Sequence, residues 1–229
     1  SGGTADKAVE DNRIVLSYNA IINKIKGKCV DIGNGNKLFT RKGSMNVTRI
    51  LDSVKIEDGD QLKIEDGVSL LKDSVVLVRG GKDVVAPVSG KIIIRDGFIY
   101  FTNKEVKVEI SNGSSLNIHE GQIVKTGQAL GTFDQYSDPI IAESDGYVHY
   151  EDVIPGSTLS ETHDSVTGST VRTITDLHLD VKQPRILITD EAGNEMGSYY
   201  LPAGAVLQVE DKQPIKAGET LAKLPKEAS

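Results

Sequence analysis

Residues 116–130 read LNIHEGQIVKTGQAL, and the same pattern returns without a gap at residues 207–221 as LQVEDKQPIKAGETL. A third and weaker copy, LKIEDGVSLLKDSVV at residues 62–76, has Asp73 where the other two have glycine. Alternate side chains of a strand point to opposite faces, so the Leu-x-Ile or Leu-x-Val start predicts a strand with one buried face. The glycine that follows predicts a turn into a return strand. Self-similarity on this scale predicts a series of β modules.

A second repeated anchor places the module boundaries. The stretch VVAPVSGKI at residues 84–92 aligns with IIAESDGYV at residues 140–148. Together the two anchors predict three tandem modules, which cover residues 12–80, 81–136 and 137–227. Modules of this size bury little apolar area alone, so we expect them to pack on one another.

Module three carries extra sequence. Gly90 and Leu116 are 26 positions apart, whereas the equivalent Gly146 and Leu207 are 61 positions apart. About 35 residues are therefore inserted in module three, and we expect them in the Ser/Thr-rich stretch around residues 155–194.

The chain as a whole is predicted to be all-β. Short runs rich in valine and isoleucine are separated by glycine-containing pairs that are typical of turns. The clearest hairpin joins residues 91–95 to residues 98–101 through Asp96-Gly97, a pair that accepts the positive φ angles of a two-residue turn. Only residues 4–11 have a weakly helical pattern, so a short helical or irregular lead-in is expected there.

Composition narrows the class of protein. The chain has 229 residues with 26 Lys and Arg against 33 Asp and Glu, and its net charge of −7 excludes a uniformly basic nucleic-acid coat. Cys29 is the only cysteine, so no disulfide or cysteine-based zinc site can form within the chain. A chain without internal disulfides fits a reducing cytoplasm. No apolar run approaches the roughly 18 residues of a membrane span, and residues 1–7 lack a signal-peptide pattern, so we expect a soluble, cytoplasmic protein.

Charge is segregated along the chain. Residues 13–50 carry a local net charge of +7, which makes them candidates for facing nucleic-acid phosphates. These candidate residues are Lys24, Lys26, Lys28, Lys37, Arg41, Lys42 and Arg49. No Lys or Arg occurs between Lys125 and Arg172, so this acidic stretch is a candidate for contact with a basic protein surface. Its candidate contact residues are Glu143, Asp145, Glu151 and Asp152, and ordinary solvated faces explain both patterns equally well.

The sequence contains no motif of a catalytic or metal site. The densest acidic cluster, in residues 57–66, lacks the ligand spacing of a calcium loop and is better explained as turns flanking strands. The four histidines are not spaced as metal ligands, and no nucleophile motif accompanies Glu161-Thr162-His163-Asp164. No glycine-rich phosphate loop occurs. We therefore expect no catalytic residue, metal or cofactor in this chain.

Part of the repeat resembles biotinyl and lipoyl carrier domains. The half-repeat is APVSGKI at residues 86–92, followed by GQIVKTGQAL at residues 121–130. Those carriers present a modified lysine beside a methionine at a hairpin tip, but neither Met45 nor Met196 adjoins a lysine. The resemblance is therefore to the fold. A carrier-like or efflux-adaptor-like β module that binds other proteins is the alternative interpretation.

A more particular resemblance covers most of the chain beyond residue 84. DGYVHYEDVIPGST at residues 145–158, YYLPAGAVL at 199–207 and GETLAKLPKE at 218–227 resemble the domain inserted in the trigger loop of the bacterial RNA polymerase β′ subunit. The start, SGGTA at residues 1–5, is similar to the sequence that follows the catalytic trigger-helix histidine of that subunit. The similarity is faint over residues 12–80, which are an addition to the shorter, two-module form of the insertion.

This resemblance implies a fold and a role. The modules would be sandwich-barrel hybrid motifs, and residues 1–11 and 228–229 would be junctions with the trigger loop. Gly2 and Gly3 would be hinge residues, unless they remain from an expression tag. The insertion would modulate nucleotide addition, pausing and transcript cleavage by biasing trigger-loop folding.

The resemblance also implies partners and cofactors. The partners would be the rest of the polymerase, with its β, β′, α and ω subunits, and downstream DNA and transcription factors would be further contacts. The chain holds no NADFDGD sequence, so the catalytic aspartates of this nucleotidyltransferase, with its Mg²⁺ and Zn²⁺, would lie outside it. The isolated chain would be monomeric and catalytically silent.

Overall fold

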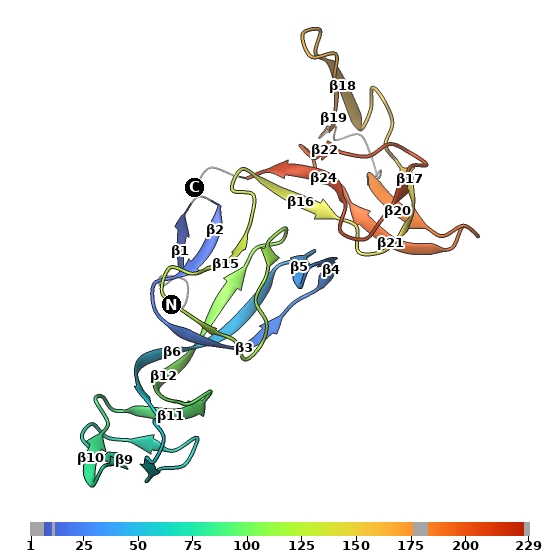
Figure 1. Ribbon diagram of the computed structural model, residues 1–229. Coiled ribbons are helices and arrows are strands. Elements are labelled where there is room, and N and C mark those ends of the chain that lie inside the picture. The colour runs from blue at the N-terminus through green and yellow to red at the C-terminus, as the bar shows by residue number, and fades with distance from the viewer. Residues whose placement is uncertain (1–6, 11, 176–182, 227–229) are drawn as a thin grey trace. The chain divides into compact units, whose positions relative to one another are not determined.

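The computed structural model describes residues 7–10, 12–175 and 183–226, and every regular element in these residues is a β-strand (Figure 1). The fold is therefore all-β. The predicted helical or irregular lead-in is wrong over Lys7–Glu10. These residues form strand β1, which pairs with β2 (Arg13–Leu16). A short isolated helix over residues 4–11 would have few internal hydrogen bonds, whereas pairing with β2 satisfies the backbone groups of β1. In the described residues no helix is long and apolar enough to cross a membrane.

The chain divides into two compact units. Unit 1 comprises Ser1–Lys26, Ser44–Glu109 and Ile118–Leu130, and unit 2 comprises Gly27–Gly43, Ile110–Asn117 and Gly131–Ser229. Each unit is thus assembled from segments that are far apart in the sequence.

Unit 1 is built on a six-stranded sheet in the order β14-β3-β6-β12-β11-β8 and a three-stranded sheet in the order β10-β9-β7. Its strands, apart from β1 and β2, are β3 (Ala20–Lys26), β6 (Gly43–Lys55), β7 (Gln61–Leu62), β8 (Ser69–Leu70), β9 (Val75–Arg79), β10 (Lys82–Val85), β11 (Gly90–Arg95), β12 (Phe98–Ile110) and β14 (Ile123–Val124). Strands β8 to β12 enclose a hydrophobic core that includes Leu77, Ile92, Ile99 and Phe101, all with no exposed surface.

Strands β11 and β12 form the hairpin that the Asp-Gly pair predicts. Lys91 lies opposite Thr102 and Arg95 lies opposite Phe98, which leaves Asp96 and Gly97 as the two turn residues. Their φ angles are +52° and +80°. Two positive φ angles give the turn a twist that matches that of the strands, so this prediction is confirmed.

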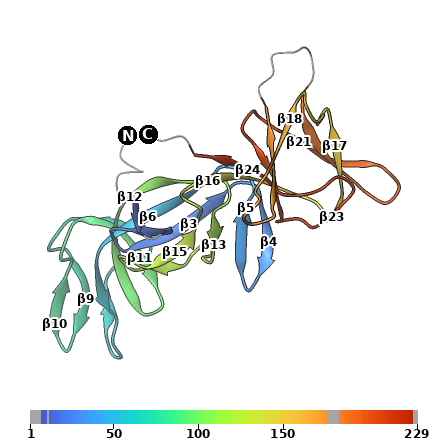
Figure 2. The ribbon, with the colours of Figure 1, turned by 90° about the horizontal axis from the view of Figure 1, so that it is seen from above.

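Unit 2 contains a small sheet segment and a larger two-sheet body. The segment is β4 (Cys29–Gly33), β5 (Asn36–Phe39), β13 (Ser115–Leu116) and the end of β15 (Ala129–Thr132). The body, here called the C-terminal sandwich, has the sheets β16-β24-β22-β19-β18 and β21-β20-β17-β23 (Figure 2). Its strands are β16 (Ser137–Ile141), β17 (Gly146–Glu151), β18 (Leu159–His163), β19 (Thr170–Ile174), β20 (Arg185–Thr189), β21 (Glu195–Tyr200), β22 (Val206–Leu207), β23 (Pro214–Ile215) and β24 (Thr220–Pro225). Both sheets bury side chains in one core.

The three copies of the sequence repeat adopt the same strand pattern. In each copy two strands of two residues precede a longer strand, as β7-β8-β9, β13-β14-β15 and β22-β23-β24. The turn before the longer strand requires a left-handed residue, with φ of +76° at Gly127, +97° at Gly218 and +72° at Asp73. Aspartate adopts this conformation more readily than most residues, which explains how the weaker copy folds without glycine.

Strand pairing in unit 1 crosses the predicted boundary between residues 80 and 81. Strand β14 pairs with β3, which is about 100 residues earlier, while β8 pairs with β11. Gly80 and Gly81 form the turn of the β9–β10 hairpin. The two compact units therefore divide the chain differently from the three modules, whose boundaries stay a prediction.

An additional hairpin lies inside the C-terminal sandwich. Strands β17 and β20 pair in the way that β11 and β12 do. However, β11 and β12 are joined by two residues, whereas β17 and β20 are joined by residues 152–184, which contain the β18–β19 hairpin. This is the stretch in which the repeat spacing changes.

Candidate functional site

The base of the β4–β5 hairpin presents two cations side by side. Cys29 pairs with Phe39, and the Thr40 N–H donates to the Lys28 carbonyl over 3.0 Å. This pairing places Lys28, just before β4, next to Arg41, just after β5. Both side chains are more than half exposed to solvent.

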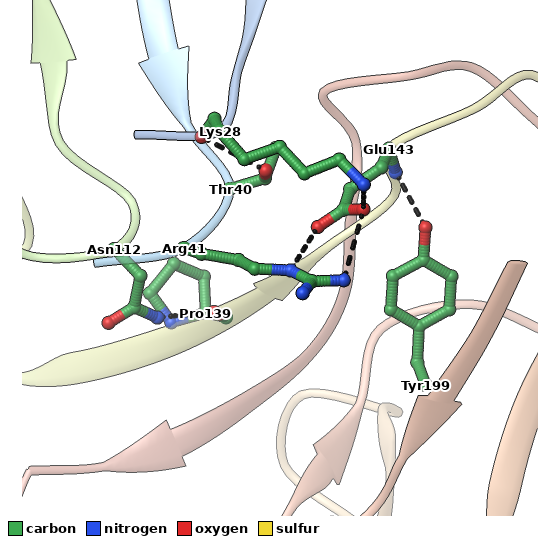
Figure 3. Close-up of polar contacts among 7 residues, drawn as sticks. All are labelled: Lys28, Thr40, Arg41, Asn112, Pro139, Glu143 and Tyr199. Atoms are coloured by element: carbon green, nitrogen blue, oxygen red, sulfur yellow. Dashed lines mark hydrogen bonds and ion pairs between the residues drawn. The ribbon is translucent and has the colours of Figure 1, made fainter. Parts of the chain in front are cut away.

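The Glu143 carboxylate forms ion pairs with both cations. It follows β16 in the C-terminal sandwich, and its side chain is only 12% exposed. Its Oε2 lies 2.6 Å from Lys28 Nζ, and its Oε1 accepts from Arg41 Nε over 2.8 Å (Figure 3). A second Arg41 nitrogen lies 3.4 Å from Oε2, so the guanidinium engages both carboxylate oxygens.

Tyr199 on β21 supports Glu143 from the other side. The Glu143 backbone N–H donates to the Tyr199 hydroxyl oxygen over 2.7 Å (Figure 3). Burial raises the pKa of Tyr199, so the phenol stays neutral at physiological pH. We call Lys28, Arg41, Glu143 and Tyr199 the Glu143 junction; all four belong to unit 2.

Two further contacts within unit 2 lie beside the junction. The Asn112 side-chain amide donates to the Pro139 carbonyl over 2.9 Å, and a Cβ added at Gly113 would lie 2.5 Å from the Pro139 ring. A Cβ at Gly218 would lie 3.4 Å from side-chain carbons of Val30 and Ile32. The β4–β5 hairpin and the 110–117 segment are therefore packed closely on the C-terminal sandwich.

Charge pairing decides the ionisation of Glu143. Burial of the carboxyl group acts to raise its pKa, but hydrogen bonds from Lys28 and Arg41 and their positive charges outweigh burial, so the pKa is lowered. The same hydrogen bond raises the pKa of Arg41. Glu143 and Arg41 therefore pair as opposite charges at neutral pH. The junction links the β4–β5 hairpin to the C-terminal sandwich, and among the described residues no three His, Cys, Asp or Glu side chains are grouped to hold a metal ion.

The structure separates the seven predicted basic residues. Lys28 and Arg41 contact Glu143, which belongs to the acidic group predicted to contact a basic protein surface. Lys37 on β5 and Lys42 after it are exposed in unit 2. The other three, Lys24, Lys26 and Arg49, are exposed on β3 and β6 of unit 1, and the Arg49 guanidinium lies 5.2 Å from the centre of the Tyr18 ring.

The remaining acidic candidates also have partners inside unit 2. Asp145 accepts from the Ala217 N–H over 2.8 Å, and Glu151 accepts from Arg185 over 2.7 Å. Asp152 has a φ of +56° and accepts at its carbonyl from the Thr158 hydroxyl, so it forms a turn. Gly2 and Gly3, with residues 228–229, lie outside the described residues. Sequence reasoning missed Tyr199, because nothing near it in the chain indicates that its hydroxyl reaches Glu143.

The Glu143 junction predicts a pH-dependent stability of unit 2. A carboxylate with a lowered pKa stabilises the fold above its unfolded-state pKa of about 4.3, and this contribution is lost as the pH falls through the lower, folded-state value. Glu143→Gln should therefore destabilise unit 2 by about 1 kcal/mol at pH 7 and low salt, and its stability should converge with that of the unchanged chain once the pH falls below the folded-state pKa of Glu143. Urea unfolding at several pH values measures this difference. Glu210→Gln, which removes a carboxylate that is 74% exposed, is the matched control and should change little.

Comparison with known proteins identifies the relatives of this chain. No protein-family model matches it. A DNA-directed RNA polymerase subunit β′ from Treponema denticola is 44% identical over 231 residues, which cover 99% of this chain and 16% of that protein. The chain is homologous to one segment of the RNA polymerase β′ subunit. The β′ subunits of Treponema pallidum and Borreliella burgdorferi are 41% and 36% identical over 98% of the chain, again 16% of each relative. The chain thus spans about one sixth of the length of the β′ subunits that it matches.

Proposed function

We propose that this chain is an insertion in the trigger loop of a bacterial RNA polymerase β′ subunit. It modulates nucleotide addition, pausing and transcript cleavage while RNA is made on a DNA template. The observation that carries this proposal is the alignment of nearly the whole chain with a single segment of β′ subunits. The trigger-loop position is supported by the similarity of residues 1–5 to the sequence after the trigger-helix histidine.

In this proposal the chain acts without chemistry of its own. The catalytic aspartates, Mg²⁺ and Zn²⁺ of the cytoplasmic enzyme belong to parts of the assembly outside this chain. The trigger loop refolds over each incoming nucleotide, so a folded insertion moves between at least two positions in every cycle. A contact that favours one position by ~1.4 kcal/mol changes the population ratio about tenfold. Contacts with the other polymerase subunits, downstream DNA or transcription factors would therefore shift pausing and cleavage.

The Glu143 junction would couple a contact on the C-terminal sandwich to the β4–β5 hairpin. Because Glu143, Lys28 and Arg41 join segments about 100 residues apart in the chain, a force on the C-terminal sandwich reaches the β4–β5 hairpin directly. Lys24, Lys26, Lys37, Lys42 and Arg49 are exposed. These five are the residues that we propose to face nucleic acid, because a cation already paired with a carboxylate attracts phosphate less strongly.

The deciding experiment uses polymerase assembled with β′ that lacks residues 12–227, with the ends joined by a short linker. We expect single-nucleotide addition to continue, while pause lifetimes and intrinsic cleavage rates change about three- to tenfold, the range that modest differential contacts produce. Two linker lengths control for strain at the joint. If all rates stay unchanged, or if addition is lost with both linkers, a modulatory role is excluded.

A further inference from the structure

One face of the C-terminal sandwich is open to solvent and carries an aromatic ring. On the β21-β20-β17-β23 sheet, Val148 and Ile188 are fully buried. Their neighbours Tyr147 on β17 and Leu187 on β20 therefore point to the opposite face, and His149 lies across from Leu187. Tyr147 is 39% exposed as a residue. We call this side of the sheet the Tyr147 face.

Two adjoining hollows lie on the Tyr147 face. Their volumes are about 670 and 500 Å³, and Tyr147, Asp190 and Glu191 line both of them. Each volume is in the range of ligand-binding clefts, which is about 300–1,000 Å³. Because Tyr147 lines both hollows, a ligand that lies across its ring can reach both.

The rim of the hollows is acidic. Five carboxylates line them against two lysines: Asp145, Asp190, Glu191, Glu195 and Glu219 against Lys212 and Lys216. Hydrogen bonds from the Asn194 side chain and from backbone N–H groups lower the pKa of Asp190, which keeps it charged. Nucleic-acid phosphates would be repelled from this rim, and a second copy of the same face would bring like charges together.

We propose that the Tyr147 face docks an extended, basic protein segment. An arginine of the partner lies on the ring of Tyr147, because a guanidinium is attracted to the face of an aromatic ring. Neighbouring basic side chains of the partner occupy the two hollows and pair with Asp190 and Glu191. This inference does not depend on the proposed function, since it rests only on the shape and charge of the sandwich.

The test is an NMR titration of the ¹⁵N-labelled 229-residue chain with the heptapeptide Gly-Arg-Val-Arg-Val-Arg-Gly. We expect the amides of residues 145–149 and 187–195 to shift, and the affinity to fall as salt is raised. The same peptide with glutamate in place of arginine should leave these amides unmoved. The proposal fails if the arginine peptide causes no shift at millimolar concentration, shifts other regions, or is matched by the glutamate peptide.

Paired variants then assign the binding to this face. Glu191→Lys with Glu195→Lys should weaken binding of the arginine peptide about tenfold or more. Glu65→Lys with Asp83→Lys, two exposed residues of unit 1, makes the same change in net charge and should leave the affinity as it was. If both double variants lose the same affinity for the arginine peptide, net charge alone explains the binding and the proposal is overturned. Self-association through the face, or movement of the same amides by a DNA duplex, would also overturn it.

Discussion

Replacement of Gly146 by alanine is expected to destabilise the C-terminal sandwich by about 3 kcal/mol or more, in the upper range for single substitutions. A Cβ at this position would lie 2.4 Å from the Thr189 carbonyl oxygen and 2.7 Å from a methyl carbon of Ile188. Both contacts are on β20, which pairs with β17 at the centre of its sheet. The backbone oxygen cannot move without breaking that pairing, so β17 itself must shift.

Gly193→Ala is the matched control for this prediction. Gly193 has a φ of +86°, but a Cβ there would meet no atom within 4 Å. Its replacement should cost only the conformational strain of a left-handed alanine, about 1 kcal/mol. Urea unfolding and amide exchange of β17 and β20 measure both variants. Equal losses at the two positions would show that the close approach at Gly146 is not what requires glycine.

Phe101→Ala is expected to destabilise unit 1 by about 3–5 kcal/mol. Phe101 has no exposed surface and lies in the core with Leu77, Ile92 and Ile99. Its removal loses the transfer free energy of a phenyl ring and leaves a cavity in the core, and the paired strands β11 and β12 limit how far this cavity can collapse. Amide exchange of β9, β11 and β12 should accelerate strongly.

Phe98→Ala removes the same side chain from a less buried place on the same strand. Phe98 keeps part of its surface exposed and stacks on Tyr100, with ring centres 5.8 Å apart. Its loss should therefore cost clearly less than that of Phe101, about 1–2 kcal/mol. If both variants lose the same free energy, the core in which Phe101 lies is not packed as described.

Local sequence patterns were sufficient for the parts of the fold that depend on neighbouring residues. The Asp96-Gly97 turn, the strand pattern of the three repeat copies and the left-handed turn at Gly127 and Gly218 all follow from backbone preferences over a few positions. The prediction for the lead-in failed because its weak helical pattern was also local, and the pairing of β1 with β2 overrode it.

The Glu143 junction depends on contacts between distant residues, which local sequence patterns do not contain. Lys28, Arg41 and Glu143 were each predicted to face an outside partner, because the basic and the acidic residues lie in separate stretches of the chain. The β4–β5 hairpin brings the two cations together, and the packing of unit 2 brings Glu143 to them from about 100 residues further along the chain.

The sequence by itself determined the all-β class, the repeated strands, the clearest hairpin and the resemblance to the β′ subunit, since these depend on residue order alone. The tertiary structure decided which strands pair across the predicted module boundary and which charges are neutralised. Both are contacts between distant residues, and their energies depend on how closely the folded chain brings those residues together and how far it excludes water from them.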